Sequence, residues 1–173
     1  DTSLANQSLP DNSNVQIESS FNVAELTFIK TQLSQSKSDQ IDSGNPTAFA
    51  LSPKFLAIGT FHGHVLLFEL GNDKIVAFLK HNKEFGSISS VTINRESTRL
   101  VAGGSRGSIS LWNLISYEML RVINDLNGLY SSILSISYLS NDHFVVLNDT
   151  SGSIFIMDVR KKNSRLQCVF SGS

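Results

Sequence analysis

The sequence contains very little cysteine, tryptophan or proline, and it has no long apolar run. Its one cysteine, Cys168, has no second cysteine to pair with, which excludes a fold held together by internal disulfides. No signal-peptide core and no stretch of about 18 apolar residues is found, so neither a secretory leader nor a membrane-spanning helix is expected. These absences favour a reducing aqueous compartment, and we expect a cytoplasmic protein.

The sequence also lacks an excess of charge of either sign. Its 14 lysines and arginines face 15 aspartates and glutamates, which gives a net charge of −1. Polyanions are bound mainly through clustered lysine and arginine side chains. We therefore expect no nucleic-acid partner, no electrostatic attachment to an anionic membrane and no direct insertion into a membrane.

The first 46 residues differ in composition from the rest of the chain. Residues 1–20 are rich in serine, asparagine and glutamine and hold too few apolar residues to offset the entropy of ordering the backbone, which predicts a flexible tail. After the N-cap candidate Asn22, apolar residues recur at helical steps. They are Val23, Leu26, Ile29 and Leu33. A polar stretch follows, so we expect a short amphipathic helix and a linker over residues 21–46.

From residue 47 onward the chain repeats a pattern of short apolar runs. Three segments align without gaps, namely IGTFHGHVLLFEL, AGGSRGSISLWNL and LNDTSGSIFIMDV. Their glycines Gly63, Gly107 and Gly152 lie 44 and 45 residues apart. A nearly constant period of this length is typical of a repeat architecture.

Each of these glycines stands between two runs with the two-residue alternation of β-strands. Glycine suits a tight hairpin turn because it accepts a positive φ without a Cβ clash. A further strand-like run precedes each hairpin and another follows it, and four strands in about 40 to 45 residues indicate a propeller blade. The expected fold class is all-β: a partial WD-repeat-like β-propeller of about three four-stranded blades over residues 47–173, preceded by the helix and the tail.

Three blades are too few for a closed ring, which commonly has four to eight. We therefore expect a segment of a larger propeller, or partners that cover its edges. Ile109, Leu111, Ile154 and Ile156 are expected to pack blade against blade. The terminal VFSGS resembles VAGGS, but it follows the third glycine by only about half a repeat, which the repeat pattern does not explain.

One short motif raises the question of catalysis. Gly103 to Gly107 satisfies G-x-S-x-G, the nucleophile elbow of serine hydrolases, with Ser105 as the nucleophile. In an elbow the serine ends a strand and a helix begins directly after it. Here the following SISLWNL alternates as a strand does, and the sister turns carry Phe61 and Thr150 at the same position. Ser105 is therefore interpreted as a turn residue.

The remaining chemical candidates form incomplete sets. His62 and His64 flank Gly63, but no further ligands stand at metal-site spacing, and exposed turn histidines are the favoured interpretation. An acid–histidine–serine grouping can be drawn from residues that also suit turns. Its members are Asp142, His143, Asp149 and Ser151.

The basic residues cluster at one place, between two expected strands. The cluster consists of Arg160, Lys161, Lys162 and Arg165. A solvated connection is favoured over a phosphate site there. We expect no catalytic, cofactor-binding or metal-binding residues, and no motif localises a partner-binding residue.

The stretch VAGGSRGSISLWNL resembles a degenerate WD repeat, because the third strand of that family usually ends in Trp-Asp and this one ends in Trp112-Asn113. Only one of the three units keeps the tryptophan, and none shows the Gly-His pair that usually opens the repeat. His62, Arg106 and Ser151 replace the aspartate that usually precedes the turn glycine. These departures favour a divergent propeller within a large scaffold.

A closer resemblance covers residues 45–173. The stretches NPTAFALSPKFLAIGTFHGHVLLFEL, GSISSVTINRESTRLVAGGSRGSISLWNL and LQCVFSGS resemble the N-terminal propeller of the vacuolar protein sorting-associated protein 8 family. That family provides a subunit of the CORVET complex, which tethers early endosomes ahead of fusion. The resemblance implies a scaffold that uses no cofactor and acts in vesicle docking and endosome-to-vacuole or endosome-to-lysosome transport.

The resemblance also implies partners and a location. The implied partners are other tethering-complex subunits and an early-endosomal Rab GTPase, and the implied location is peripheral on endosomal membranes. The light-chain-like propeller of the HOPS tether shares phrases such as FLAIGT followed by HG, so it stands as an alternative. A generic WD-repeat scaffold is a second alternative, and a serine hydrolase using Ser105 is a remote third.

Overall fold

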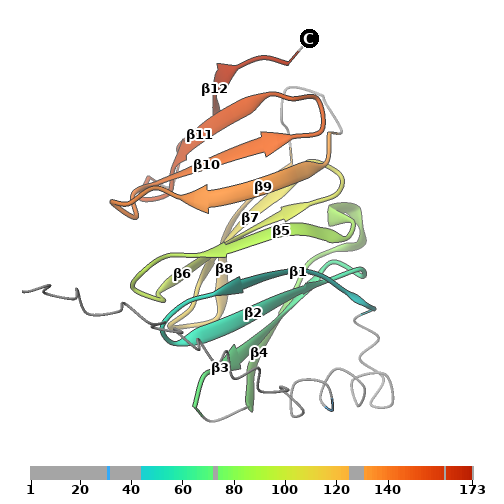
Figure 1. Ribbon diagram of the computed structural model, residues 1–173, viewed down its shortest axis with the longest axis vertical. Helices are drawn as coiled ribbons and strands as arrows, with labels where there is room; N and C mark the ends of the chain where they lie inside the picture. The colour runs from blue at the N-terminus through green and yellow to red at the C-terminus, as the bar shows by residue number, and fades with distance from the viewer. Residues whose placement is uncertain (1–30, 32–43, 72–73, 125–130, 162, 173) are drawn as a thin grey trace, which may run out of the picture.

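The computed structural model describes residue 31 and residues 44–71, 74–124, 131–161 and 163–172. Within these residues the chain forms three four-stranded antiparallel sheets, which confirms the expected all-β class (Figure 1). The expected tail, residues 1–20, lies outside the described residues, and so does most of the expected helix and linker, residues 21–46.

Each sheet is a meander whose strands follow one another in chain order. The first blade contains β1 (Pro46–Leu51), β2 (Phe55–Thr60), β3 (His64–Glu69) and β4 (Lys74–Lys80). A short 3-10 helix, η1 (Lys83–Phe85), leads to the second blade, which contains β5 (Ile88–Ile93), β6 (Arg99–Gly104), β7 (Ile109–Asn113) and β8 (Glu118–Ile123). The third blade contains β9 (Ile133–Tyr138), β10 (Phe144–Asp149), β11 (Ile154–Asp158) and β12 (Gln167–Phe170).

The three repeat glycines adopt one conformation. Gly63, Gly107 and Gly152 have φ angles of 80°, 81° and 80°. In each turn the glycine N–H donates to the carbonyl three residues earlier at 3.1 Å, which closes a turn between the second and third strands of its blade. These φ angles lie in the left-handed region, where a Cβ is penalised, so the expectation of glycine hairpins is confirmed.

The blades pack face to face. Whether a residue of the third strand contacts the preceding or the following blade depends on how many positions it stands after the turn glycine. Residues two and four positions after the glycine face the following blade, as Ile109 and Leu111 do in the core shared with the third blade. The residue five positions after faces the preceding blade, as Trp112 does in the core shared with the first. This follows from the alternation of side chains along a strand.

The expected blade-to-blade packing of Ile154 and Ile156 needs a correction. Their neighbours Phe155 and Met157 pack against the second blade, so Ile154 and Ile156 lie on the opposite face of the third blade. Ile154 accordingly remains 39% exposed, whereas Ile109 is 1% exposed at the equivalent position. Ile154 and Ile156 occupy the same strand positions as Ile109 and Leu111, but within the described residues no fourth blade covers their face.

The first strands of the blades lie side by side, with β5 between β1 and β9 (Figure 1). Close approach between blades is possible there because Gly103 of β6 faces Ile133 of β9. A Cβ on Gly103 would lie 2.7 Å from Ile133 Cγ2, closer than real Cβ contacts come. Gly59 of β2 faces Ile88 of β5 in the same way.

The short spacing before VFSGS has a simple cause. Its first residues belong to β12, which pairs with β11 as the fourth strand of the third blade. VAGGS lies at the end of β6 and in the turn after it, so the two segments resemble each other although their strands hold different positions in their blades.

Candidate functional site

Ser105 lies in the turn after β6, and strand β7 follows it instead of a helix. Its backbone N–H donates to the Ser87 carbonyl at 2.8 Å, and its Oγ accepts from the Ser87 N–H at 3.1 Å. The hydroxyl thus joins the turn to the loop that enters β5. The strand–turn–helix context of a nucleophile elbow is not present at this motif.

A buried polar network centred on His81 was not expected from the sequence. His81 Nδ1 lies 2.8 Å from the Gly63 carbonyl, and Nε2 lies 2.6 Å from Ser110 Oγ. A carbonyl only accepts, so Nδ1 carries the proton and Nε2 accepts from the Ser110 hydroxyl. Trp112 Nε1 donates to the same Ser110 oxygen at 3.0 Å. The network joins a turn of the first blade to a strand of the second.

His81 is held in its neutral form. Burial lowers its pKa from 6.5 to about 4, although the hydrogen bond to the Gly63 carbonyl opposes this shift. Ser110 is fully buried and His81 is 8% exposed, so their short hydrogen bond lies within the contact between the two blades. The arrangement is that of a structural network between blades.

A sequence signal for this network existed. His81 stands before the first strand of its blade, where WD repeats carry the histidine of a Gly-His pair, but Lys80 precedes it instead of glycine. A search for histidine alone at that position would have found it.

His62 and His64 both lie at a cleft between the first two blades. Burial, followed by the charges of Lys80 and His62, lowers the pKa of His64. His64 Nδ1 is buried and makes no hydrogen bond within the described residues. Among these residues no group of three or more histidine, cysteine, aspartate or glutamate side chains is arranged to hold a metal ion.

The acid–histidine–serine grouping is not assembled. Asp142 and His143 precede β10 and Asp149 ends it, so the extended strand separates the two halves. Asp149 Oδ1 accepts from Ser151 Oγ at 2.6 Å and from Ser151 N at 3.0 Å, as expected of turn residues. Asp142 Oδ2 accepts from the backbone N–H of Arg95 at 3.0 Å, which links the third blade to the second.

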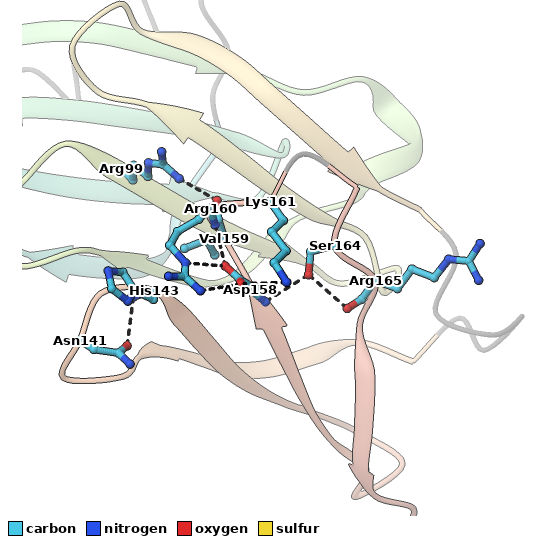
Figure 2. Close-up of polar contacts among 9 residues, drawn as sticks. All are labelled: Arg99, Asn141, His143, Asp158, Val159, Arg160, Lys161, Ser164 and Arg165. Atoms are coloured by element: carbon cyan, nitrogen blue, oxygen red, sulfur yellow. Dashed lines mark hydrogen bonds and ion pairs between the residues drawn. The ribbon is translucent and has the colours of Figure 1, made fainter.

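Two residues of the basic cluster, Arg160 and Lys161, lie beside the carboxylate of Asp158 (Figure 2). Asp158 accepts from Arg160 Nε at 3.1 Å and from Arg160 Nη2 at 2.9 Å, and Lys161 Nζ lies 4.0 Å away. The Arg160 hydrogen bonds are the main reason that the pKa of Asp158 falls from 3.8 to about 2. Ser164 Oγ accepts from the Asp158 N–H, while the Arg165 side chain points away from the carboxylate (Figure 2). Lys162 lies outside the described residues.

A cleft of about 770 Å³ lies between the first and second blades. Three segments form it: the turn after β2, the loop from His81 to Ser87 that contains η1, and the turn after β6. Lys83 and Arg106 are the lysine and arginine residues that line it. We define this hollow as the interblade cleft.

Three stacked four-stranded meanders with glycine turns in register define a segment of a β-propeller. Two solved structures are similar to this chain. The β-propeller domain of Cps50 (Swd1) from Myceliophteria thermophila is similar with a TM-score of 0.63 and 17% identity, over 73% of this chain and 39% of that one. The computationally designed Ika4 protein is similar with a TM-score of 0.61 and 16% identity, over 75% of this chain and 76% of that one. These likenesses show the fold.

The family follows from sequence comparison. The model of the Vps8 β-propeller matches residues 19–173, and the chain belongs to this family. Vacuolar protein sorting-associated protein 8 homologs are similar to it: that of Mus musculus is 35% identical over 152 residues and that of Homo sapiens is 34% identical over 148. Each alignment covers 80% of this chain and 10% of the relative, so the chain spans about a tenth of the length of these relatives. Within the described residues, no helix is both long and apolar enough to cross a membrane.

Proposed function

We propose that this chain is the protein-interaction propeller of an endosomal membrane-tethering subunit, which acts in vesicle docking and in transport from endosomes to the vacuole or lysosome. The match of residues 19–173 to the Vps8 β-propeller carries this proposal. Its partners in the proposal are other tethering-complex subunits and an early-endosomal Rab GTPase, and it is peripheral on endosomal membranes.

The contacts between blades support a scaffolding mechanism. Two apolar cores join the second blade to its neighbours, and the His81 network fixes a turn of the first blade against the second. A frame of this kind presents its loops in fixed positions, which lowers the entropy lost when a partner binds. In the proposal the chain acts by holding loops in place, without catalysis.

The experiment uses the full-length protein that contains this propeller, with and without residues 47–173. We expect removal to abolish recruitment to endosomes and to abolish binding of a GTP-loaded early-endosomal Rab or of a sister tethering subunit. If both activities survive the removal, the proposed function is wrong. Binding to a late-endosomal partner set instead would favour the HOPS-type alternative, and binding without any endosomal association would favour a generic WD-repeat scaffold.

The serine hydrolase alternative is tested separately with an active-site phosphonate probe. Because the Ser105 hydroxyl accepts a hydrogen bond from a backbone N–H and lies in a strand-to-strand turn, we expect no labelling. Labelling that disappears in Ser105→Ala would establish catalysis and overturn the scaffold proposal.

A further inference from the structure

Hydrogen bonds connect the walls of the interblade cleft to one another. Two hydrogen bonds between Ser87 and Ser105 hold the loop of η1 against the turn after β6. His81, buried beneath, ties the same loop to the Gly63 carbonyl in the turn after β2. All three walls are therefore fixed to one another before any ligand arrives, and a preformed site loses little entropy on binding.

The lining of the cleft carries positive charge and no carboxylate. Lys83 and Arg106 are exposed, and neither makes an ion pair with an acidic group in the described part of the chain. Arg106 Nη1 donates to the Lys83 carbonyl at 3.3 Å, which keeps the guanidinium beside the lysine. Glu84 is adjacent in η1, but it is not among the lining residues. This local excess contrasts with the net charge of −1 for the whole chain.

Two further groups restrict what can occupy the cleft. His64 lines the cleft as a half-buried side chain, and its Nδ1 makes no hydrogen bond within the described residues. Phe61 stands 62% exposed in the turn after β2 and offers apolar surface beside the basic residues. An occupant that matches Phe61 and the two basic residues therefore needs apolar and anionic groups close together.

The volume of the cleft favours a peptide over a membrane surface or a nucleic acid as the anion that binds there. A volume of about 770 Å³ accommodates several side chains of a peptide, within the usual range of about 300 to 1,000 Å³ for ligand sites. A membrane surface or a nucleic acid is bound instead by an extended basic surface. The described lining holds one lysine and one arginine, which is too little for such a surface.

We propose that the interblade cleft is a binding site for an acidic segment of a partner protein, whose aspartate or glutamate side chains contact Lys83 and Arg106 and whose adjacent apolar side chain contacts Phe61. This proposal rests on the proposed interaction function, because its occupant is a protein. It goes further by naming the surface and the chemistry of the segment that binds there.

The test measures fluorescence anisotropy with the full-length protein and a fluorescein-labelled peptide of sequence EEDLFEDE. The neutral peptide QQNLFQNQ is the control for charge, and heparin is the control for polyanion binding. The variants are Lys83→Glu with Arg106→Glu, and Phe61→Ser. Lys74→Glu is the matched control, because Lys74 is an exposed lysine at the end of β4 far from the cleft. In the strand register Lys74 lies opposite Glu69, whereas Lys80, at the cleft end of β4, lies opposite His64.

We expect saturable binding of the acidic peptide below about 1 mM and much weaker binding of the neutral one. The double charge reversal is expected to weaken binding roughly tenfold or more, Phe61→Ser several-fold, and Lys74→Glu less than about twofold. No saturable binding, or equal losses in Lys74→Glu and the cleft variants, would overturn the proposal. Preferential loss of heparin binding in the cleft variants, with the peptide unaffected, would assign the site to a polyanion and would also overturn it.

Rab and sister-subunit binding by the same variants is measured in parallel. Loss of peptide binding with intact Rab binding places the cleft outside the Rab contact and leaves the proposed function standing. Intact peptide binding in a protein that fails every recruitment assay supports the cleft while the proposed function fails.

Discussion

At the scale of single residues, His81 shows how a side chain of ordinary chemistry becomes structural through its surroundings. It is 8% exposed, and each ring nitrogen has a partner from a different blade. Truncating such a residue removes these two hydrogen bonds and a longer third one, from Trp112 Nε1 at 3.3 Å, and leaves the Gly63 carbonyl and the Ser110 hydroxyl buried with lost partners.

His81→Ala is therefore expected to lower the free energy of unfolding by about 3 kcal/mol. His143→Ala is the matched control, because His143 is exposed and is expected to change stability by less than about 0.5 kcal/mol. Urea denaturation followed by Trp112 fluorescence measures both. Equal midpoints for the two variants would show that the network contributes nothing.

The lowered pKa of His81 also predicts a pH dependence. The folded pKa is about 4 and the ordinary value is 6.5, so between these values the unfolded chain binds more protons than the folded one. The stability that His81 provides is therefore complete above about pH 6.5 and is lost as the pH falls toward 4, by an amount on the order of 3 kcal/mol. The wild-type protein is expected to lose more stability over this interval than His81→Ala, measured by urea unfolding at several pH values. Parallel profiles would contradict the assignment of a neutral, buried His81.

At the scale of strands, contact between blades depends on small residues at one position. Gly103 in β6 lies opposite Ile133 in β9, and an added Cβ would come within 2.7 Å of Ile133 Cγ2 and 2.9 Å of Ile136 Cδ1. Since the φ angle of Gly103 is not in the left-handed region, the obstacle to a side chain is lack of space alone.

Gly103→Ala is expected to cost about 1 to 3 kcal/mol through overpacking. Ile133→Ala removes Cγ2 and keeps the Ile133 Cβ at 2.8 Å, so the cost of Gly103→Ala should be reduced but not abolished in that background. A double-mutant cycle measured by urea denaturation should give a coupling above about 0.5 kcal/mol. Additive effects would mean that the sheets simply separate to admit the methyl group.

The strands and turns were predictable from sequence, because alternation and glycine position are local properties. Gly63, Gly107 and Gly152 marked the hairpins correctly. The interblade cleft was not predictable, because it exists only where the loop after β4 meets turns that precede it and follow it in the chain. Likewise, the different surroundings of Ile109 and Ile154 depend on which blade has a neighbour, and the repeat itself does not carry that information.

At the scale of the whole molecule, the second blade belongs to both apolar cores. Leu100, Ala102 and Trp112 pack toward the first blade, while Val101, Ile109 and Leu111 pack toward the third. The second sheet cannot unfold without breaking both cores. If either outer sheet separates, one apolar face of the second sheet becomes exposed. Repeat architectures unfold as one unit when such interfaces contribute more than the individual repeats.

We therefore expect one cooperative transition for the chain. The single tryptophan, Trp112, reports the interface of the first two blades, whereas far-UV circular dichroism reports strands of all three. Urea midpoints from the two probes should coincide.

Ile109→Ala creates a cavity at the interface of the second and third blades, and it should lower both midpoints together. The expected loss in the free energy of unfolding is about 2 to 4 kcal/mol. If Ile109→Ala instead splits the dichroism curve into two steps and leaves the Trp112 midpoint unchanged, the third blade unfolds independently. The frame that positions the loops would then extend over the first two blades, which are the pair that forms the interblade cleft.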